Sequence, residues 1–335
     1  MDLTVIWFIL ITVLFVGFFF LEGFDYGVGM LLPFIGKNDV ERRIIINTIG
    51  PVWDGNEVWM ITAGGALFAA FPHVYATMFS SFYLALFLML LALIVRGVAF
   101  EFRSKDENPT WRSAWDWSIF FGSLIPALLW GVAVTNLLQG IPVNEKMIYV
   151  GTFFDLLSPY TLVGGLAFLF VFLFHGAMFL TLKIASEAMI VRIRIAAIKI
   201  GAIAASFFVL CIILTYTNTD LFANTFAAAC LLGAAVVFVI GYLSAYNKKY
   251  IYGFVMSSLA VVLTTIAFFA GLFPRLIVSS LNEQWSLTIY NASSTTYTLQ
   301  IMTIAAVCLV PVILLYQGWT YWVFRKRVSE KNLEY

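Results

Sequence analysis

Charged residues are scarce in this chain of 335 residues: they make up 11% of it, against 62% hydrophobic residues. The mean hydropathy is +0.95. A water-soluble domain of this length cannot bury so much apolar surface. We therefore expect an all-α, polytopic membrane protein. The formal net charge of +1 says little about partners, so the positions of the charged residues along the chain are more informative.

Cysteine and histidine are also rare, with three and two residues respectively. Cys211, Cys230 and Cys308 stand singly inside apolar stretches, so we expect buried, unreactive thiols. The sequence contains no Cys/His set with metal-site spacing, no phosphate-binding glycine loop and no Ser/His/Asp arrangement. It therefore lends no support to hydrolysis, phosphate chemistry or nucleic-acid binding.

The two histidines are predicted on opposite sides of the membrane. His73 falls in an outer turn, and His175 lies about 22 Å along its helix from the outer end. One haem cannot then take both as ligands. A solvated loop residue and a hydrogen-bonded helix residue are favoured over single axial haem ligands.

Nine apolar stretches are long enough to cross a bilayer, which takes about 20 helical residues. They cover residues 5–32, 52–71, 74–95, 117–138, 160–182, 195–216, 222–242, 252–271 and 298–322. The second and third form the firmest hairpin, with a turn at Phe71-Pro72-His73. After the third, a loop is expected from Arg96 to Trp117, with Asp116 opening the fourth stretch.

Basic residues alternate between the connections. Of the 19 Lys and Arg residues, 17 follow the odd-numbered stretches, and only Lys146 and Arg275 fall on the other side. Because cytoplasmic loops carry the excess of Lys and Arg, the N-terminus is predicted outside and the C-terminus inside.

The stretch from Gly50 to Phe68 carries Asp54 and Glu57 three residues apart, on one face of a helix. The first stretch repeats this spacing with Glu22 and Asp25 near its inner end. Carboxyls in apolar sequence normally mark an ion path or a proton relay. The simpler alternative is a set of hydrated acids at the membrane rim.

In the inner loop, Asn38 followed by acidic residues is typical of a helix N-cap. We expect the helix to continue through residues 44–49 and to bend at Pro51. The first two stretches meet at this side. We therefore expect one cluster of four acids there, some of which hold protons because close carboxylates repel. Its members are Glu22, Asp25, Asp54 and Glu57.

Several long motifs then resemble subunit II of the cytochrome bd-type quinol oxidases. They are Leu21-Glu22-Gly23-Phe24-Asp25-Tyr26-Gly27-Val28-Gly29, Asn38-Asp39-Val40-Glu41-Arg42-Arg43, Trp53-Asp54-Gly55-Asn56-Glu57-Val58-Trp59, Ile61-Thr62-Ala63-Gly64-Gly65-Ala66-Leu67-Phe68-Ala69-Ala70, Arg103-Ser104-Lys105, Trp115-Asp116-Trp117 and Asn136-Leu137-Leu138-Gln139-Gly140. The first 142 residues carry nearly all of the resemblance. Several long motifs in the same order are far more specific than one short pattern.

The resemblance implies a haem-free subunit of a bacterial plasma-membrane enzyme that oxidises quinol and reduces dioxygen to water. Two haems b and one haem d would be held by the partner, subunit I. It also implies two four-helix bundles, at residues 1–142 and 143–272, with a peripheral ninth helix in 273–335. The acid of the Trp53-Asp54 pair would take protons from the cytoplasm toward the oxygen-reducing haems, with Glu57 beside it. Asp25 and Asp116 match family acids without an assigned role, and Glu22 is a further acidic candidate.

Two alternatives belong to other classes. An ion-coupled secondary transporter would also have about nine helices and intramembrane acids, but the second half of the chain lacks matching polar residues. A purely structural subunit would use the acids only to orient helices or to bind a lipid or quinone. The identity of the quinol, a structural quinone in this subunit and a small extra subunit stay open.

Overall fold

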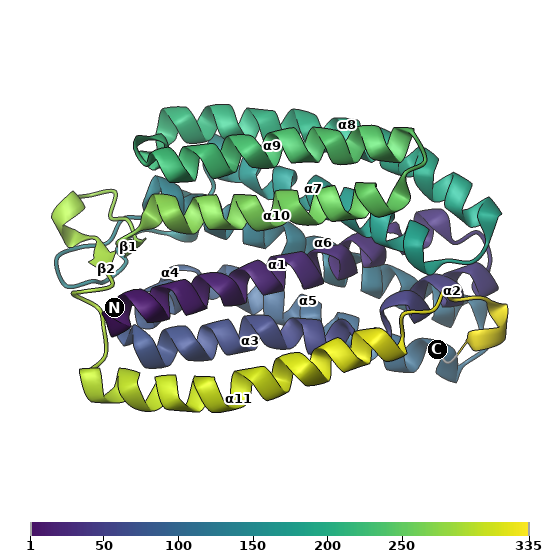
Figure 1. Ribbon diagram of the computed structural model, residues 1–335, viewed down its shortest axis with the longest axis horizontal. Helices are drawn as coiled ribbons and strands as arrows, with labels where there is room; N and C mark the ends of the chain where they lie inside the picture. The colour runs from purple at the N-terminus through teal and green to yellow at the C-terminus, as the bar shows by residue number, and fades with distance from the viewer. Residues whose placement is uncertain (1, 334–335) are drawn as a thin grey trace.

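The computed structural model describes residues 2–333, most of which are helical (Figure 1). The helices are α1 (Leu3–Ile35), α2 (Asp39–Ile49), α3 (Trp53–Ala70), α4 (Pro72–Ser81), α5 (Tyr83–Phe102), α6 (Pro109–Gln139), α7 (Pro159–Lys183), α8 (Glu187–Asn218), α9 (Thr225–Tyr246), α10 (Tyr250–Leu272) and α11 (Thr296–Val323). Two short strands, β1 (Arg275–Ile277) and β2 (Leu287–Thr288), pair antiparallel. Short 3-10 turns occupy Arg103–Lys105, Phe153–Leu156, Leu221–Ala223, Glu283–Trp285 and Glu330–Asn332.

The long helices run side by side along the longest axis, and the two termini lie at opposite ends of the molecule (Figure 1). Eight of the described helices are long and apolar enough to cross a membrane. The remaining expected crossing corresponds to α3, which is only 18 residues long and less apolar because its first turns carry Asp54, Asn56 and Glu57. The prediction of an all-α, multi-pass membrane protein is confirmed. The number nine stays a prediction.

Most helix starts follow from local sequence. Asn38 caps α2 by accepting a hydrogen bond from Glu41 N at 2.9 Å, as expected, and α2 ends just before Pro51. Asn108 and Ser158 cap α6 and α7, and each is followed by a proline at the first helical position. Proline there loses no helical hydrogen bond, so these dipeptides define the starts sharply.

The third predicted stretch, 74–95, starts within two residues of α4 but ends too early, and it is not one helix. It is divided at Phe82 into α4 and α5, and α5 continues to Phe102. The connection before α6 is therefore short, and the predicted loop from Arg96 to Trp117 does not form. Arg96 is a fully buried helix residue, and Asp116 lies two turns inside α6. Both residues were predicted outside the helices because we assumed that a charged residue marks the boundary of an apolar stretch.

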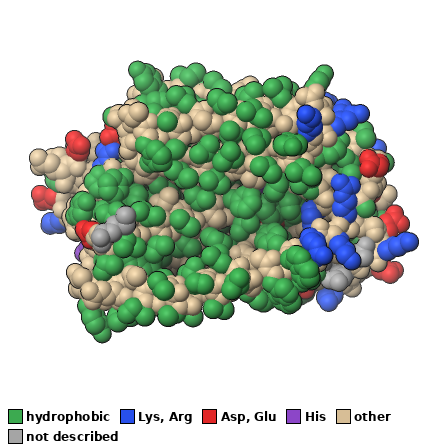
Figure 2. All heavy atoms as spheres, viewed as in Figure 1, with side chains coloured by type: hydrophobic (Ala, Val, Ile, Leu, Met, Phe, Trp, Pro, Cys, Tyr) green, Lys and Arg blue, Asp and Glu red, His purple; other side chains and the backbone are tan. Residues whose placement is uncertain are grey.

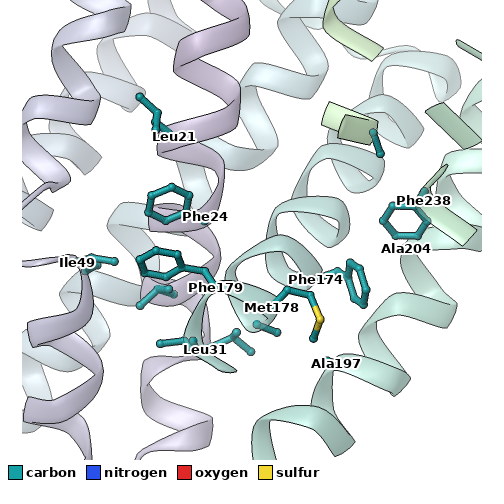
Figure 3. Close-up of a cluster of buried hydrophobic side chains, with 14 of the residues drawn as sticks. Leu21, Phe24, Leu31, Ile49, Phe174, Met178, Phe179, Ala197, Ala204 and Phe238 are labelled. Atoms are coloured by element: carbon teal, nitrogen blue, oxygen red, sulfur yellow. The ribbon is translucent and has the colours of Figure 1, made fainter. Parts of the chain in front are cut away.

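The centre of the molecule is α1, which packs against α3, α6, α7 and α10. In the C-terminal half of α1, Phe24 stacks on Phe179 of α7 with ring centroids 4.1 Å apart. Leu21, Leu31, Phe174 and Met178 extend this buried cluster between the helices (Figure 3). The packing therefore joins the first helices of the chain directly to those of its second half.

Two glycines allow α1 and α7 to cross closely. A methyl group at Gly27 would overlap the carbonyl oxygen of Phe172 and lie 2.9 Å from Cα of Gly176. Backbone on both sides leaves no flexible side chain to move away. Small residues at a helix crossing are typical of membrane proteins, where close backbone contact replaces the hydrophobic driving force.

Gly27→Ala is therefore expected to destabilise the chain by about 2–3 kcal/mol through overpacking, lowering the thermal midpoint of the purified protein in detergent. Gly64→Ala is the matched control, since nothing lies within 4 Å of a methyl group there. The control should be neutral or slightly stabilising, because alanine favours a helix over glycine by about 1 kcal/mol. Equal midpoints for both variants would contradict a tight α1–α7 crossing.

The predicted outer loop at 273–297 departs from the mostly helical architecture. Strands β1 and β2 lie in it, and Ser279 pairs with Ile141 in the connection after α6. Arg275 binds both carboxylate oxygens of Asp220, at 2.8 and 2.7 Å. These contacts fasten three connections together at the end of the molecule where the N-terminus lies.

Charge is unevenly distributed along the long axis. In the view of Figure 2, most Lys and Arg side chains gather at the end that carries the C-terminus, and a broad hydrophobic band separates the two ends. The band is typical of a surface that faces lipid or another apolar partner. The expectation for the thiols was only partly right: Cys211 is buried, Cys230 is half-buried and Cys308 is exposed on α11.

Candidate functional site

One guanidinium stands at the centre of the buried acids. Nη1 of Arg96 on α5 lies 2.5 Å from Oε1 of Glu22 on α1 and 2.9 Å from Oε1 of Glu57 on α3. The side chains of Arg96 and Glu22 are fully buried, and that of Glu57 is 17% exposed. Three helices therefore converge on one cation, and Glu57 connects the buried pair to the surface of α3.

Aromatic rings surround the same cation. The rings of Tyr26, Phe100 and Trp53 lie 5.0, 5.6 and 6.0 Å from the guanidinium carbon of Arg96. Ring faces attract a cation most strongly where water is excluded. Gly122 on α6 lets α5 approach at this level, since a methyl group there would meet Cβ of Arg96 and the carbonyl oxygen of Ala92. Trp53 is thus a wall of the cation site.

Asp25 forms the second part of the cluster. Its Oδ2 accepts a hydrogen bond from Nδ2 of Asn56 at 2.6 Å, and both residues are fully buried. Oδ1 of Asn56 in turn accepts from the hydroxyl of Tyr321 at 2.8 Å and from Nε2 of Gln317 at 3.4 Å. Because two donors hold the amide oxygen, the amide nitrogen is directed at Asp25.

The two α11 residues were missed as site residues. Gln317 and Tyr321 lie four residues apart, on one face of α11. Gln317 also accepts from Nε1 of Trp59 at 2.9 Å. The four-residue spacing of these two polar side chains could have indicated that this face of α11 contacts a polar site. Helix α11 is mostly exposed, but Gln317 and Tyr321 near its C-terminal end complete the acid cluster.

Asp54 lies at the edge of this cluster. It is exposed at the start of α3, and its carboxylate accepts from the backbone N–H of Gly55 at 2.7 Å. It is close enough to interact electrostatically with Asp25 and Glu57. The acids therefore form a sequence from an exposed carboxylate through a half-buried one to two fully buried ones. Arg96, placed in a loop from sequence, is the residue that joins them.

Several buried polar atoms of the acid cluster have no hydrogen-bond partner within the described protein. Within residues 2–333, Oε2 of Glu22, Oδ1 of Asp25 and both Nε and Nη2 of Arg96 are buried without a protein partner. Buried polar atoms of this kind are usually satisfied by internal water. The cluster can thus hold water molecules between its charged groups.

Asp116 belongs to a separate ion-pair network. Its carboxylate lies 2.6 Å from Nε of Arg103 and 2.8 Å from Nη1 of Arg42. Asp39 accepts from Arg103 at 3.0 Å and from Arg112 at 2.7 Å. These contacts join α2 to the α5–α6 connection. Asp116 is therefore not brought together with Glu22, Asp25 and Glu57.

Glu41 pairs with Arg192 of α8 at 2.8 Å, and both side chains are 21% exposed. Partial burial raises the pKa of Glu41, but hydrogen bonds from Arg192 and the backbone of Lys37 outweigh it and hold that pKa below its ordinary value. A carboxylate with a lowered folded pKa stabilises the protein above its unfolded pKa, and this contribution is lost as the pH falls through the folded value.

Glu41→Gln is accordingly expected to lower stability by about 0.5 kcal/mol at neutral pH. The difference in thermal midpoint from the unmodified protein should disappear below a pH of about 4. Glu101→Gln, at an exposed position on α5, is the control and should have no effect at either pH. A Glu41 effect that is equal at both pH values would mean that the ion pair is not its cause.

The histidines are arranged as polar residues of the scaffold. Both ring nitrogens of His175 are engaged, with Ser257 Oγ at 2.8 Å and the carbonyl oxygen of Phe20 at 3.1 Å. His73 is exposed in the turn at the start of α4. Among the described residues, no three His, Cys, Asp or Glu side chains are grouped to hold a metal ion. These positions do not fit a pair of haem ligands.

Comparison with known proteins identifies the same family as the sequence motifs. Residues 3–324 match the family model described as cytochrome bd terminal oxidase subunit II. The chain belongs to this family. It is 44% identical over 329 residues to cytochrome bd ubiquinol oxidase subunit 2 of Bacillus subtilis, covering 98% of this chain and 97% of that protein.

Other relatives extend the match. Cytochrome bd-I ubiquinol oxidase subunit 2 of Escherichia coli strain K12 is 39% identical over 364 residues, covering 98% of this chain and 96% of that one. A solved structure of bd oxidase from Geobacillus thermodenitrificans superposes with a TM-score of 0.77 over 97% of this chain and 100% of that chain. At 18% identity, that likeness supports the fold alone. The family resemblance inferred from the motifs is confirmed, and this member is a multi-pass bacterial membrane protein.

Proposed function

We propose that this chain is the haem-free membrane subunit of a bd-type quinol oxidase, which oxidises quinol and reduces dioxygen to water. The near full-length identity of 44% to a cytochrome bd ubiquinol oxidase subunit carries the proposal. Two haems b and one haem d would be ligated by a partner, subunit I; in support, both ring nitrogens of His175 already have hydrogen-bond partners in this chain.

The chain would cross the membrane nine times, with its N-terminus outside and its C-terminus in the cytoplasm. Supporting this arrangement, the termini lie at opposite ends, α3 runs alongside α1, and Lys and Arg gather at the C-terminal end (Figures 1 and 2). The proposed division is a first bundle in 1–142, a second in 143–272 and the peripheral α11 in 273–335.

Within this oxidase, we assign the chain a proton-uptake route from the cytoplasm. Asp54 is the exposed first acceptor beside Trp53, and Glu57 is half-buried one turn further along α3. If every group is ionised, Glu22, Asp25 and Glu57 place three negative charges around the single positive charge of Arg96. Such an imbalance in a low-dielectric site favours a shared proton and bound water.

The test of the function is co-purification. The tagged chain, purified in mild detergent from its native membrane, should bring a haem-bearing partner. Its reduced-minus-oxidised spectrum should show haem b and haem d bands, and added quinol should drive oxygen uptake. A haem-free chain that purifies alone from membranes containing the partner would contradict the proposal. Substrate-dependent uptake by the chain alone in proteoliposomes would instead identify a transporter.

A further inference from the structure

A second polar site lies at the C-terminal end of the molecule; its lining includes Tyr321, which also contacts the acid cluster through Asn56. A pocket of about 390 Å³ opens between the α2–α3 connection, the end of α7 and the tail that follows α11. Its charged lining consists of Lys183, Arg325, Lys326 and Arg327, and within residues 2–333 no acidic residue lines it. Nothing in the proposed oxidase function uses this group of cations.

Contacts of the tail make the pocket a formed site. Val328 donates its backbone N–H to the carbonyl oxygen of Lys183 at 2.6 Å, and Ala185 donates to Val328 O at 3.0 Å. Nζ of Lys183 also donates to the carbonyl oxygen of Phe324. The tail is therefore fastened to the end of α7 by main-chain and side-chain bonds, and the cations are held around a shared space.

Many of the cationic N–H groups stay available to a ligand. Arg325 stacks on the ring of Trp322, with its guanidinium carbon 4.3 Å from the ring centroid, and uses one N–H on the carbonyl oxygen of Trp322. Lys326 and Arg327 are exposed along the pocket wall. Four cations, with no carboxylate among the lining residues that the structure describes, repel one another, so an anion that enters lowers the energy of the site.

The position of the pocket suggests the class of anion. The apolar spans α7 and α11 end at Lys183 and Val323, so the pocket lies at the level where a hydrocarbon core gives way to headgroups. Basic pockets between helices on the cytoplasmic side are typical sites for phosphate-bearing lipid headgroups. The charge of the pocket, its depth in the membrane and its preformed shape thus all favour a ligand that carries a phosphate group.

We propose that this pocket binds the phosphate group of an anionic ligand, with Lys183 and Arg325 to Arg327 as its cationic lining. An anionic phospholipid headgroup and free phosphate share this chemistry. The proposal is independent of the oxidase function, because it depends only on this chain and the surrounding membrane.

Amine labelling of the purified complex in nanodiscs tests it. With phosphatidylcholine alone, an amine-reactive reagent should modify Lys326 as readily as Lys248 and Lys249, which are exposed at the same end outside the pocket. Adding phosphatidylglycerol should slow the labelling of Lys326 selectively. Protection by phosphatidylglycerol but not by inorganic phosphate identifies the lipid as the source, and protection by inorganic phosphate alone identifies a soluble ligand. Absence of protection, or equal protection of all three lysines, would overturn the proposal.

Substitution provides a second readout. Arg325→Gln and Arg327→Gln should each weaken the protecting effect about fivefold, the loss expected for one cation near an anionic headgroup. Lys248→Gln is the matched control and should leave protection of Lys326 unchanged. Undiminished protection in the doubly substituted complex would also overturn the proposal. If that variant does not assemble, the labelling of the unmodified complex still tests the proposal.

Discussion

Arg96→Leu should destabilise the chain by about 3–5 kcal/mol, the usual cost of leaving a buried charge without its partner. Removing this guanidinium leaves the carboxylate of fully buried Glu22 and that of Glu57 facing each other without a cation. Native proteins have a total stability of only about 5–15 kcal/mol. We therefore expect little assembled complex, a low haem content and a strongly lowered thermal midpoint.

Two further variants separate charge from shape in this prediction. Lys105→Leu removes an exposed cation near the same end of α5 and should leave the midpoint nearly unchanged. Adding Glu22→Gln and Glu57→Gln to Arg96→Leu removes the unpaired charges and should recover much of the lost stability. If Arg96→Leu alone assembles normally, the guanidinium does not hold the three helices together.

Asp54→Asn should slow quinol-dependent oxygen reduction by at least about tenfold, because an amide cannot take up and release the proton that a positioned carboxyl transfers. Haem content and assembly should stay near normal. Asp54 is exposed, and its hydrogen bond is to the backbone of its own neighbour, Gly55. The measurement is oxygen uptake with quinol, normalised to haem absorbance.

Glu187→Gln provides the control for this variant, since it removes another exposed carboxylate at the first residue of α8. It should turn over at the rate of the unmodified complex. Asp54→Glu should retain much of the activity, because the carboxyl group is still present. Full turnover by Asp54→Asn would remove Asp54 from the proton route and support a purely structural role for the acids.

The variants at Arg96 and Asp54 thus report on different properties. Arg96 is fully buried between helices and is expected to affect assembly. Asp54 lies at the rim and is expected to affect the rate alone. A loss of haem from both variants, in equal measure, would indicate that the acid cluster has only a structural role.

The sequence by itself determined the class of protein and the placement of most helices. An apolar content of 62% requires a membrane environment, and the apolar runs predict helices in the order that the structure shows, except that the third run is divided into α4 and α5. Caps such as Asn38 and the Ser158-Pro159 pair act through bonds to their nearest neighbours, so their effect can be read locally. The motifs around Asp54 were long enough to identify the family.

Only the tertiary structure decided which charges are buried together. Arg96 was assigned to a loop because a lone cation normally ends an apolar stretch. It is tolerated inside α5 only because Glu22 and Glu57 come from helices distant in sequence. In the same way, Asn56 and Tyr321 meet across 265 residues of chain. Such pairings depend on how helices pack, and hydropathy or spacing within a single helix does not record them.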